Sequence, residues 1–312
     1  MSPPVTSIDG GNDIKKQIKI PLHIAARKGY LDCLKILISV GKVDVFRKSE
    51  HGITALHLAA ANGSIRVVEE LLKSGPGLKH LKDESKRTAL FFAMKHVKVV
   101  EILINSGAKV NIKDKHNRTP ISYAAEKGLL ECTNKLIENE ADINFEDKEK
   151  MRPIHYAAEK GHSEVFRVLL DKTDQAEFEN FYWNCLDLAI NENQVEIAYA
   201  IFQTQDSEKW KIMLRSRSKH DDSDSKCVDT PMRKLIRKMP DVAKVVFDKC
   251  TQIKSTRNKH FTVKFNYEFL DDTYYLGGWK ETTHKKRGKV AENVHDDLQE
   301  NKDEEKNQKT SK

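Results

Sequence analysis

The sequence predicts a mostly α-helical solenoid, and three observations lead to this fold class. A phrase of about ten residues recurs along the chain, as in "TALHLAAANG" (54–63), "TPISYAAEKG" (119–128) and "RPIHYAAEKG" (152–161). Apolar residues with the three- and four-residue spacing of a helix follow each copy. The copies also start at nearly regular intervals, at residues 20, 54, 88, 119, 152 and 184.

The interval between copies identifies the type of repeat. Successive starts lie 34, 34, 31, 33 and 32 residues apart. A period near 33 that carries the pattern T-P-L-H-x-A is the signature of ankyrin repeats, so the chain resembles that family. We expect six repeats over residues 20–203. Because no single repeat can bury its apolar face alone, the repeats must stack around one continuous core.

Each repeat is expected to begin with a short helix. Thr54 and Thr119 suit the N-cap, where a side-chain oxygen satisfies a backbone N–H, and the proline that often follows needs no N–H there. A glycine should end the helix, because left-handed dihedral angles cost glycine least. A second helix and a projecting finger come next, such as residues 106–117 and 139–150. The expected terminal glycines are Gly29, Gly63, Gly128 and Gly161.

Two copies depart from the pattern. The third copy, "TALFFAMKHVKVVEIL" (88–103), lacks the glycine and is two residues shorter between its helices, so we expect a tightened turn there. The sixth copy (184–202) also lacks the glycine. It resembles the terminal unit of an array, which faces a different kind of neighbour.

Composition favours a cytosolic, non-enzymatic chain. The 312 residues are 38% hydrophobic and 32% charged, which is enough for one elongated array and a smaller module. The first 30 residues lack a signal-peptide core, and no apolar run reaches the roughly 20 residues of a membrane span. No phosphate-binding loop, catalytic nucleophile motif or zinc-protease helix is present. We therefore expect no enzyme, no metal and no cofactor.

The five cysteines fall into two groups. An odd number without a C-x-x-C pair favours a reducing compartment. Cys33, Cys132 and Cys185 stand at apolar helical positions and are expected to be buried. Cys227 and Cys250 each follow a lysine, so they are the candidate reactive thiols.

Beyond the array the pattern changes twice. Residues 204–229 are expected to form a polar linker with a short helix, and the first residues, 1–19, an extension. Residues 230–275 begin with Thr230 and Pro231 and predict two short helices broken at Pro240, the second with Val242, Val245, Val246 and Phe247 inward. Residues 260–272 alternate apolar and polar residues, which predicts a strand that needs a partner. The charged stretch 276–312 is expected to be disordered.

Positive charge concentrates after the array. Residues 209–259 hold fifteen Lys and Arg against six Asp, whereas the whole chain is only +7. This suggests an anionic membrane surface or inositol phosphate as a partner, although a solvated linker would look the same. Nucleic acid is not expected, because no aromatic stacking platform accompanies the basic residues. The candidate contacts are Arg233, Lys234, Arg237 and Lys238.

The segments after the array carry a second resemblance. In order, "NCLDLAINENQVEIAYAIF" (184–202), "TPMRKLIRKMPDVAKVVFDKC" (230–250) and "HFTVKFNYEFLDDTYY" (260–275) resemble the end of the ankyrin domain and the pre-membrane linker of transient receptor potential ankyrin-type (TRPA) cation channels. The resemblance implies a cytoplasmic segment of a sensory cation channel, with a helix–strand module coupled to a pore.

The same resemblance limits what the chain is expected to do. Only Cys250 keeps a family cysteine, while Val242 and Asn258 stand where sensing cysteines are expected, so electrophile sensing is not expected. After Tyr275 the sequence leaves the family pattern and no pore follows. We expect a fragment, a short isoform or a pore-less product that associates with full-length channel subunits.

A soluble adaptor is the alternative interpretation of the sequence. Ankyrin arrays offer a long concave surface and projecting fingers to protein partners. The finger residues expected to contact a partner are Lys113, Asp114, Lys115, His116, Asp147 and Lys148.

Overall fold

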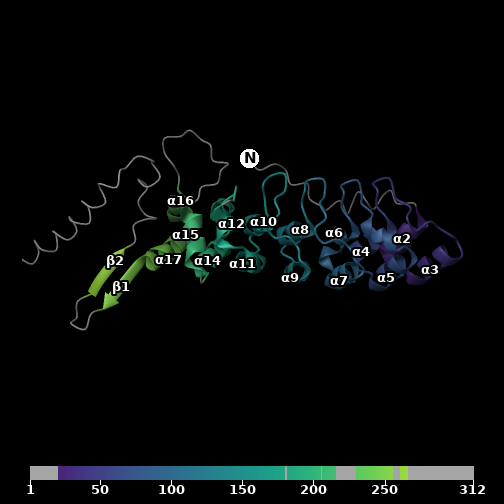
Figure 1. Cartoon of the computed structure of the whole chain (residues 1–312), viewed down its shortest axis with the longest axis horizontal. Helices are drawn as coiled ribbons and strands as arrows, with labels where there is room; N and C mark the ends of the chain where they lie inside the picture. Colours follow the sequence, from purple (N-terminus) through teal and green to yellow (C-terminus); the bar gives the residue numbers. More distant parts are fainter. Residues whose placement is uncertain (1–19, 180, 205, 216–229, 256–260, 266–312) are drawn as a thin grey trace, which may run out of the picture.

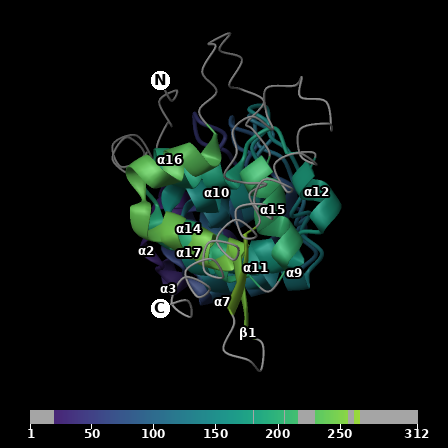
Figure 2. The same cartoon turned by 90° about the vertical axis from the view of Figure 1, so that its left-hand side faces the viewer.

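The computed structural model describes residues 20–179, 181–204, 206–215, 230–255 and 261–265. Its helices pair and stack side by side into an elongated rod, with α2 at one end and a β-hairpin near the other (Figure 1). The end-on view shows the successive helix pairs lying behind one another (Figure 2). The mostly helical solenoid predicted from the repeats is confirmed.

The helices alternate between a first and a second member of each pair. The first helices are α2 (Pro21–Lys28), α4 (Ala55–Asn62), α6 (Ala89–Phe92), α8 (Pro120–Glu126), α10 (Pro153–Lys160) and α13 (Cys185–Asn191). Their partners are α3 (Leu31–Ser39), α5 (Ile65–Ser74), α7 (Val97–Asn105), α9 (Leu130–Glu138), α11 (Ser163–Lys172) and α14 (Val195–Gln203). Every first helix begins one residue after a predicted repeat start, so the first residue of each motif is the N-cap.

Glycine ends the first helix for two reasons that act together. Gly63 adopts φ 70°, and Gly161 adopts φ 76°, in the left-handed region that other residues disfavour. A Cβ at Gly63 would also lie only 2.5 Å from Nδ1 of His96, which belongs to the next repeat. The predicted glycine positions are therefore needed both for the turn and for close approach between repeats.

The third repeat replaces this glycine turn with a tighter helix. α6 has only four residues and continues directly into the 3₁₀ helix η2 (Ala93–Lys95). A 3₁₀ helix rises about 2.0 Å per residue rather than about 1.5 Å, so it covers the distance with fewer residues. This is the tightened turn predicted from the two missing residues.

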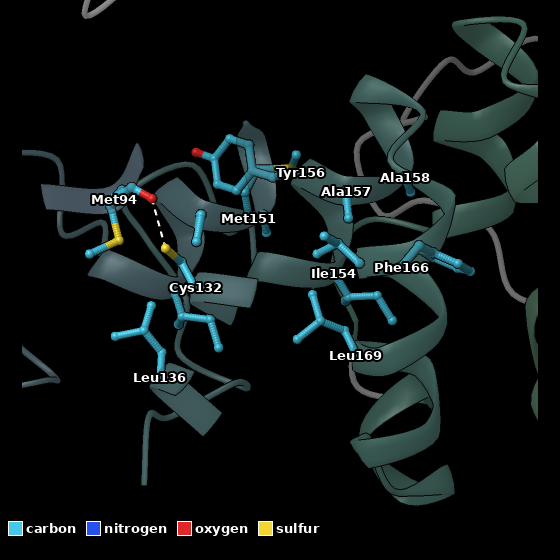
Figure 3. Close-up of a cluster of buried hydrophobic side chains, with 14 of the residues drawn as sticks. Met94, Cys132, Leu136, Met151, Ile154, Tyr156, Ala157, Ala158, Phe166 and Leu169 are labelled. Atoms are coloured by element: carbon cyan, nitrogen blue, oxygen red, sulfur yellow. Dashed lines mark hydrogen bonds between the residues drawn. The ribbon is translucent and has the colours of Figure 1, made fainter. Parts of the chain in front are cut away.

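Apolar residues of successive repeats form one continuous core. Figure 3 shows part of it, where Met94, Cys132 and Leu136 pack on one side and Ile154, Phe166 and Leu169 follow in the next repeat. The paired alanines of the motif, such as Ala157 and Ala158, are completely buried between neighbouring first helices. Small side chains at these positions allow the helices to approach closely.

Cys33 shows what stacking does, because it was expected to be buried and is exposed. The equivalent position in later repeats is held by Val67, Val99, Cys132, Val165 and Ile197, all of which are buried. This position faces the preceding repeat. Among the described residues no helix pair precedes α2, so the Cys33 side chain has nothing to cover it.

Two helices that the repeat pattern does not contain lie near the end of the array, one after the fifth pair and one after the sixth. α12 (Gln175–Glu179) stands where the next finger would be, and α15 (Ser207–Arg215) packs beside it. Nζ of Lys209 donates to the carbonyl of Leu170 at 2.8 Å, and Nδ2 of Asn184 donates to the carbonyl of Met213 at 2.6 Å. The short helix expected in a polar linker is thus part of the packed core.

The next helix pair continues the stack. α16 (Pro231–Lys238) packs against α13, and α17 (Pro240–Cys250) packs against α14, as in a further repeat. The Thr230 hydroxyl accepts from the N–H of Arg233 at 3.3 Å, which confirms the predicted cap. Val242 and Val246 are buried as expected, but Phe247 is exposed. Phe247 was placed inward because it extends an apolar run, whereas a helix turns its next residue 100° away.

A two-stranded antiparallel sheet ends the described chain. β1 (Thr251–Ser255) continues directly from α17 and pairs with β2 (Phe261–Phe265), with Ile253 opposite Val263. β2 lies within the predicted strand 260–272, and its partner is an extended piece of the same module. Residues 266–272 of that prediction lie outside the described residues.

Candidate functional site

The fingers between repeats hold their own carboxylates inward. Oδ1 of Asp114 accepts from the N–H groups of His116 and Arg118, both at 2.8 Å. Oδ1 of Asp147 accepts in the same way from Glu149 at 2.8 Å and Met151 at 2.9 Å. Asp114 is only 4% exposed and Asp147 only 6%, so the structure does not support the expected partner contact through these two residues. They hold the turn instead.

A cation neutralises the buried Asp114, whereas Oδ2 of Asp147 accepts from the Tyr156 hydroxyl. The Arg118 guanidinium lies 3.2 Å from Oδ2 of Asp114 and 3.3 Å from Oε2 of Glu126. The same carboxylates raise the pKa of Arg118, although its partial burial acts in the opposite direction. In the preceding finger Arg87 pairs with Asp83 at 2.7 Å.

The lysines of the fingers point outward. Lys113, Lys115 and Lys148 are exposed, and His116 is half-buried. These four of the predicted contact residues lie together, because backbone hydrogen bonds join consecutive fingers. The N–H of Lys115 donates to the carbonyl of Ser85 at 2.8 Å, and the N–H of Lys148 donates to that of His116 at 3.1 Å.

A cluster around Arg152 ends this row of fingers, and sequence reasoning missed it. The Arg152 guanidinium pairs with Glu146 at 3.1 Å and with Glu177 of α12 at 2.6 Å. Nε1 of Trp183 donates to the carbonyl of Glu149 at 2.9 Å, in the place of a further finger. The available signal was the Arg at a motif position that otherwise favours Thr.

The motif histidines join one repeat to the next. Nδ1 of His57 accepts from the N–H of Thr54 at 3.1 Å, and its Nε2 lies 3.2 Å from the carbonyl of Arg87, the residue immediately before the following repeat. Only a neutral ring with its proton on Nε2 satisfies both contacts. His23 makes the corresponding contact with the carbonyl of Ile53 at 2.9 Å.

Burial keeps these rings neutral. Desolvation lowers the pKa of His57 to about 4 and that of His155 to about 3, and it also lowers the pKa of His23. The described residues contain no group of three or more His, Cys, Asp or Glu side chains that would hold a metal ion. The contacts of His23 and His57 connect successive repeats within the core.

The basic face of α16 is smaller than the sequence suggested. Nζ of Lys234 lies 2.9 Å from Oδ1 of Asp187, and both side chains are largely buried. This ion pair takes the place of the motif histidine in the sixth repeat, so the Lys234 ammonium faces the core and not a membrane. Arg233, Arg237 and Lys238 remain on the exposed side.

The two candidate reactive thiols, Cys250 and Cys227, do not both lie among the described residues. Cys250 is only 5% exposed because the end of α17 packs into the core, and this burial opposes the reactivity expected of a candidate thiol. Cys227 lies outside the described residues. Burial raises the pKa of Cys132 to about 11, and burial also raises that of Cys185.

None of the described helices is both long and apolar enough to cross a bilayer.

Comparison with known proteins identifies the class. A family described as ankyrin repeats, in three-copy blocks, matches residues 8–80, 77–147 and 121–211. These matches cover more than half of the chain and coincide with the stacked helix pairs. The chain belongs to the ankyrin-repeat family.

Individual relatives show which ankyrin-repeat proteins the chain is similar to. The chain is 29% identical over 273 residues to the transient receptor potential cation channel subfamily A member 1 homolog of Caenorhabditis elegans, which covers 85% of this chain and 22% of the relative. It is 32% identical over 263 residues to the human subfamily A member 1, which covers 82% and 20%. The chain is thus similar to the ankyrin region of TRPA channels and spans about a fifth of their length.

A relative of another kind is similar over a shorter stretch. The ankyrin repeat and KH domain-containing protein mask-1 of Caenorhabditis elegans is 35% identical over 133 residues. That similarity covers 42% of this chain and 5% of the relative.

The buried histidines predict a loss of stability in mild acid. Their folded-state pKa values lie below the ordinary 6.5, so the unfolded chain binds protons first as the pH falls. The stability they contribute is complete above pH 6.5 and declines toward the folded pKa values near 4 and 3. Between pH 7.5 and pH 5.0 we expect a loss of about 1–2 kcal/mol for each of His57 and His155, measured by urea unfolding.

A pair of variants isolates this effect. Replacing both buried rings, His57→Gln with His155→Gln, should flatten the pH dependence between pH 7.5 and 5.0. Replacing the exposed His51 by Gln should leave it unchanged. Equal pH dependence in the wild type and the double variant would show that other groups cause it.

The thiols predict a clear order of reactivity. In a Cys227→Ser background, iodoacetamide should modify the exposed Cys33 rapidly in the native protein. Cys132, Cys185 and Cys250 should react at least about a hundredfold more slowly, because they react only after local opening. Mass spectrometry of the digested protein reports each site, and all four should react in urea. Rapid modification of Cys250 would contradict its burial.

Proposed function

We propose that the chain acts as a cytoplasmic regulatory segment related to TRPA-type channels and associates with full-length channel subunits. The observation that supports this is the extent of the similarity. It covers 273 residues with the Caenorhabditis elegans channel relative, well beyond the repeats at 20–203, whereas the similarity to mask-1 covers only 133. The similarity therefore includes the module that follows the array.

The arrangement of this module suits such a role. α16 and α17 stack on α13 and α14, and the sheet continues from α17 without a linker. Ile236 is 48% exposed on α16, and Phe247 is exposed on α17. We infer that they face another subunit.

A second candidate function rests on the fingers. Their exposed lysines are held in fixed register by backbone hydrogen bonds, as in a preformed binding surface. Under this hypothesis the chain is an adaptor that contacts a protein partner through Lys113, Lys115, His116 and Lys148. Because the two candidates use different elements, the fingers in one case and α16 with α17 in the other, variants can separate them.

Co-purification with a full-length TRPA-type subunit tests both candidates. Tagged chain is co-expressed with the Caenorhabditis elegans relative, and the recovered channel is measured. Ile236→Asp with Phe247→Asp should reduce recovery about tenfold, because each change places a charge in an apolar contact. The matched control is Ile36→Asp with Val40→Asp, two exposed apolar residues at the other end of the rod.

Three results are informative. Loss with the module variant alone supports association through α16 and α17. Loss with a finger variant alone, Lys115→Glu with Lys148→Glu, supports the adaptor. No recovery of the channel with the wild-type chain refutes the first proposal.

Contact with anionic lipid is a smaller proposal that uses the exposed side of α16. Arg233 and Arg237 flank Ile236 on one helical face, the pattern of an interfacial helix. Each basic residue near an anionic surface contributes about 1 kcal/mol. Arg233→Glu with Arg237→Glu should abolish flotation with phosphatidylserine vesicles, while Lys73→Glu with Lys98→Glu should not. Equal flotation of both variants would refute lipid contact at α16.

A further inference from the structure

The fingers expose their cations, whereas most of their carboxylates are buried or paired. The sequence alone does not show this difference. The formal charge of the four fingers is nearly neutral, because they contain eight Lys and Arg and seven Asp and Glu. The fingers are residues 47–52, 81–86, 112–117 and 145–150. In the structure the three aspartates are buried, and Glu146 pairs with Arg152 at 3.1 Å and with Lys150 at 3.5 Å. Three exposed glutamates remain against all eight exposed cations.

We call this surface the finger ridge. Its exposed cations are Arg47, Lys48, Lys82, Lys86, Lys113, Lys115, Lys148 and Lys150. Its exposed anions are Glu50, Glu84 and Glu149. The ridge thus carries a net charge of about +5, although the whole chain is only +7.

The ridge is continuous and its backbone is fixed. The N–H of Glu84 donates to the carbonyl of His51 at 3.2 Å, and the same bond recurs between the later fingers. Laterally, Nζ of Lys48 donates to the carbonyl of Lys82 at 2.9 Å, and Nζ of Lys113 lies 3.7 Å from the centre of the Phe145 ring. The loops lie in one row along the upper edge of the rod in Figure 1.

The same chain contains a segment of opposite charge. Residues 292–305, "ENVHDDLQENKDEE", hold seven Asp and Glu and one Lys, a net charge of −6. We propose that the finger ridge is a docking surface for an acidic peptide, and that segment 292–305 of this chain occupies it. Charge complementarity between a fixed basic row and an acidic segment favours the encounter and aligns the two.

The lengths of chain allow this contact. Residues 266–291 separate β2 from the acidic segment, and 26 residues span at most about 90 Å. Stacked helix layers lie about 8–10 Å apart, so the fingers nearest to β2 are about 30–40 Å away. The acidic segment, extended to about 45 Å, would cover the four fingers. The proposal does not depend on the channel similarity, because the segment follows the point where that resemblance ends.

Carbodiimide crosslinking of the full-length chain tests the contact. This reagent joins a carboxylate directly to a lysine amine, so crosslinked peptides map the contact by mass spectrometry. At low salt we expect links from residues 292–305 to Lys82, Lys115 and Lys148. They should disappear near 1 M salt, where the Debye length is about 3 Å. Reversing these three charges by Lys→Glu should reduce links to the remaining ridge lysines about tenfold.

A matched variant controls for net charge. Lys73→Glu, Lys98→Glu and Lys172→Glu change the chain by the same charge at exposed helical sites, and they should leave the ridge links unchanged. A restored link in a charge-swapped chain, with Asp303, Glu304 and Glu305 changed to Lys on the reversed ridge, would confirm direct pairing. In that chain the new lysines link to the new ridge glutamates.

Three results would overturn the proposal. The first is the absence of links from 292–305 to the ridge in the wild-type monomer at low salt. The second is an equal loss of links in the ridge variant and in the helix variant, which would indicate long-range charge only. Links found only between isotopically distinct chains would also refute occupation within one chain. None of these readouts involves the channel subunit, so failure here leaves the co-purification result unaffected.

Discussion

Burial of each helix pair by its neighbours is the constraint on which the rest of this molecule depends. The alanine pairs, the left-handed glycines and the neutral histidines all lie at contacts between successive repeats. The position held by Cys33 is buried in each later repeat and exposed in the first. A residue's environment therefore depends on its place in the stack as much as on its type, since each unit contacts only the units beside it.

Sequence periodicity predicted most of the array because the same contacts recur at each motif position. It could not predict where that recurrence ends. α12 replaces a finger, and Trp183, Arg152 and Glu177 supply contacts that no motif encodes. Likewise, the ion pair between Asp187 and Lys234 joins residues separated by 47 positions, so neither residue signals it locally.

The candidate contact surfaces were harder to predict for a related reason. Sequence gives the charge of a loop but not the direction in which each side chain points. Asp114 and Asp147 accept backbone N–H groups within their own turns, a role that short carboxylates commonly take in loops. The lysines beside them are too long for that role and extend into solvent, so a loop of mixed charge presents mainly one sign.

The placement of α16 and α17 on the sixth repeat has a mechanical consequence. Because the Lys234–Asp187 pair and apolar packing make this helix pair one more layer, β1 extends directly from the last layer of the rod. A small tilt at each layer of a solenoid adds to those before it. A torque applied near α2 would consequently emerge at β1 and β2 as a larger swing, with the whole array acting as a lever arm.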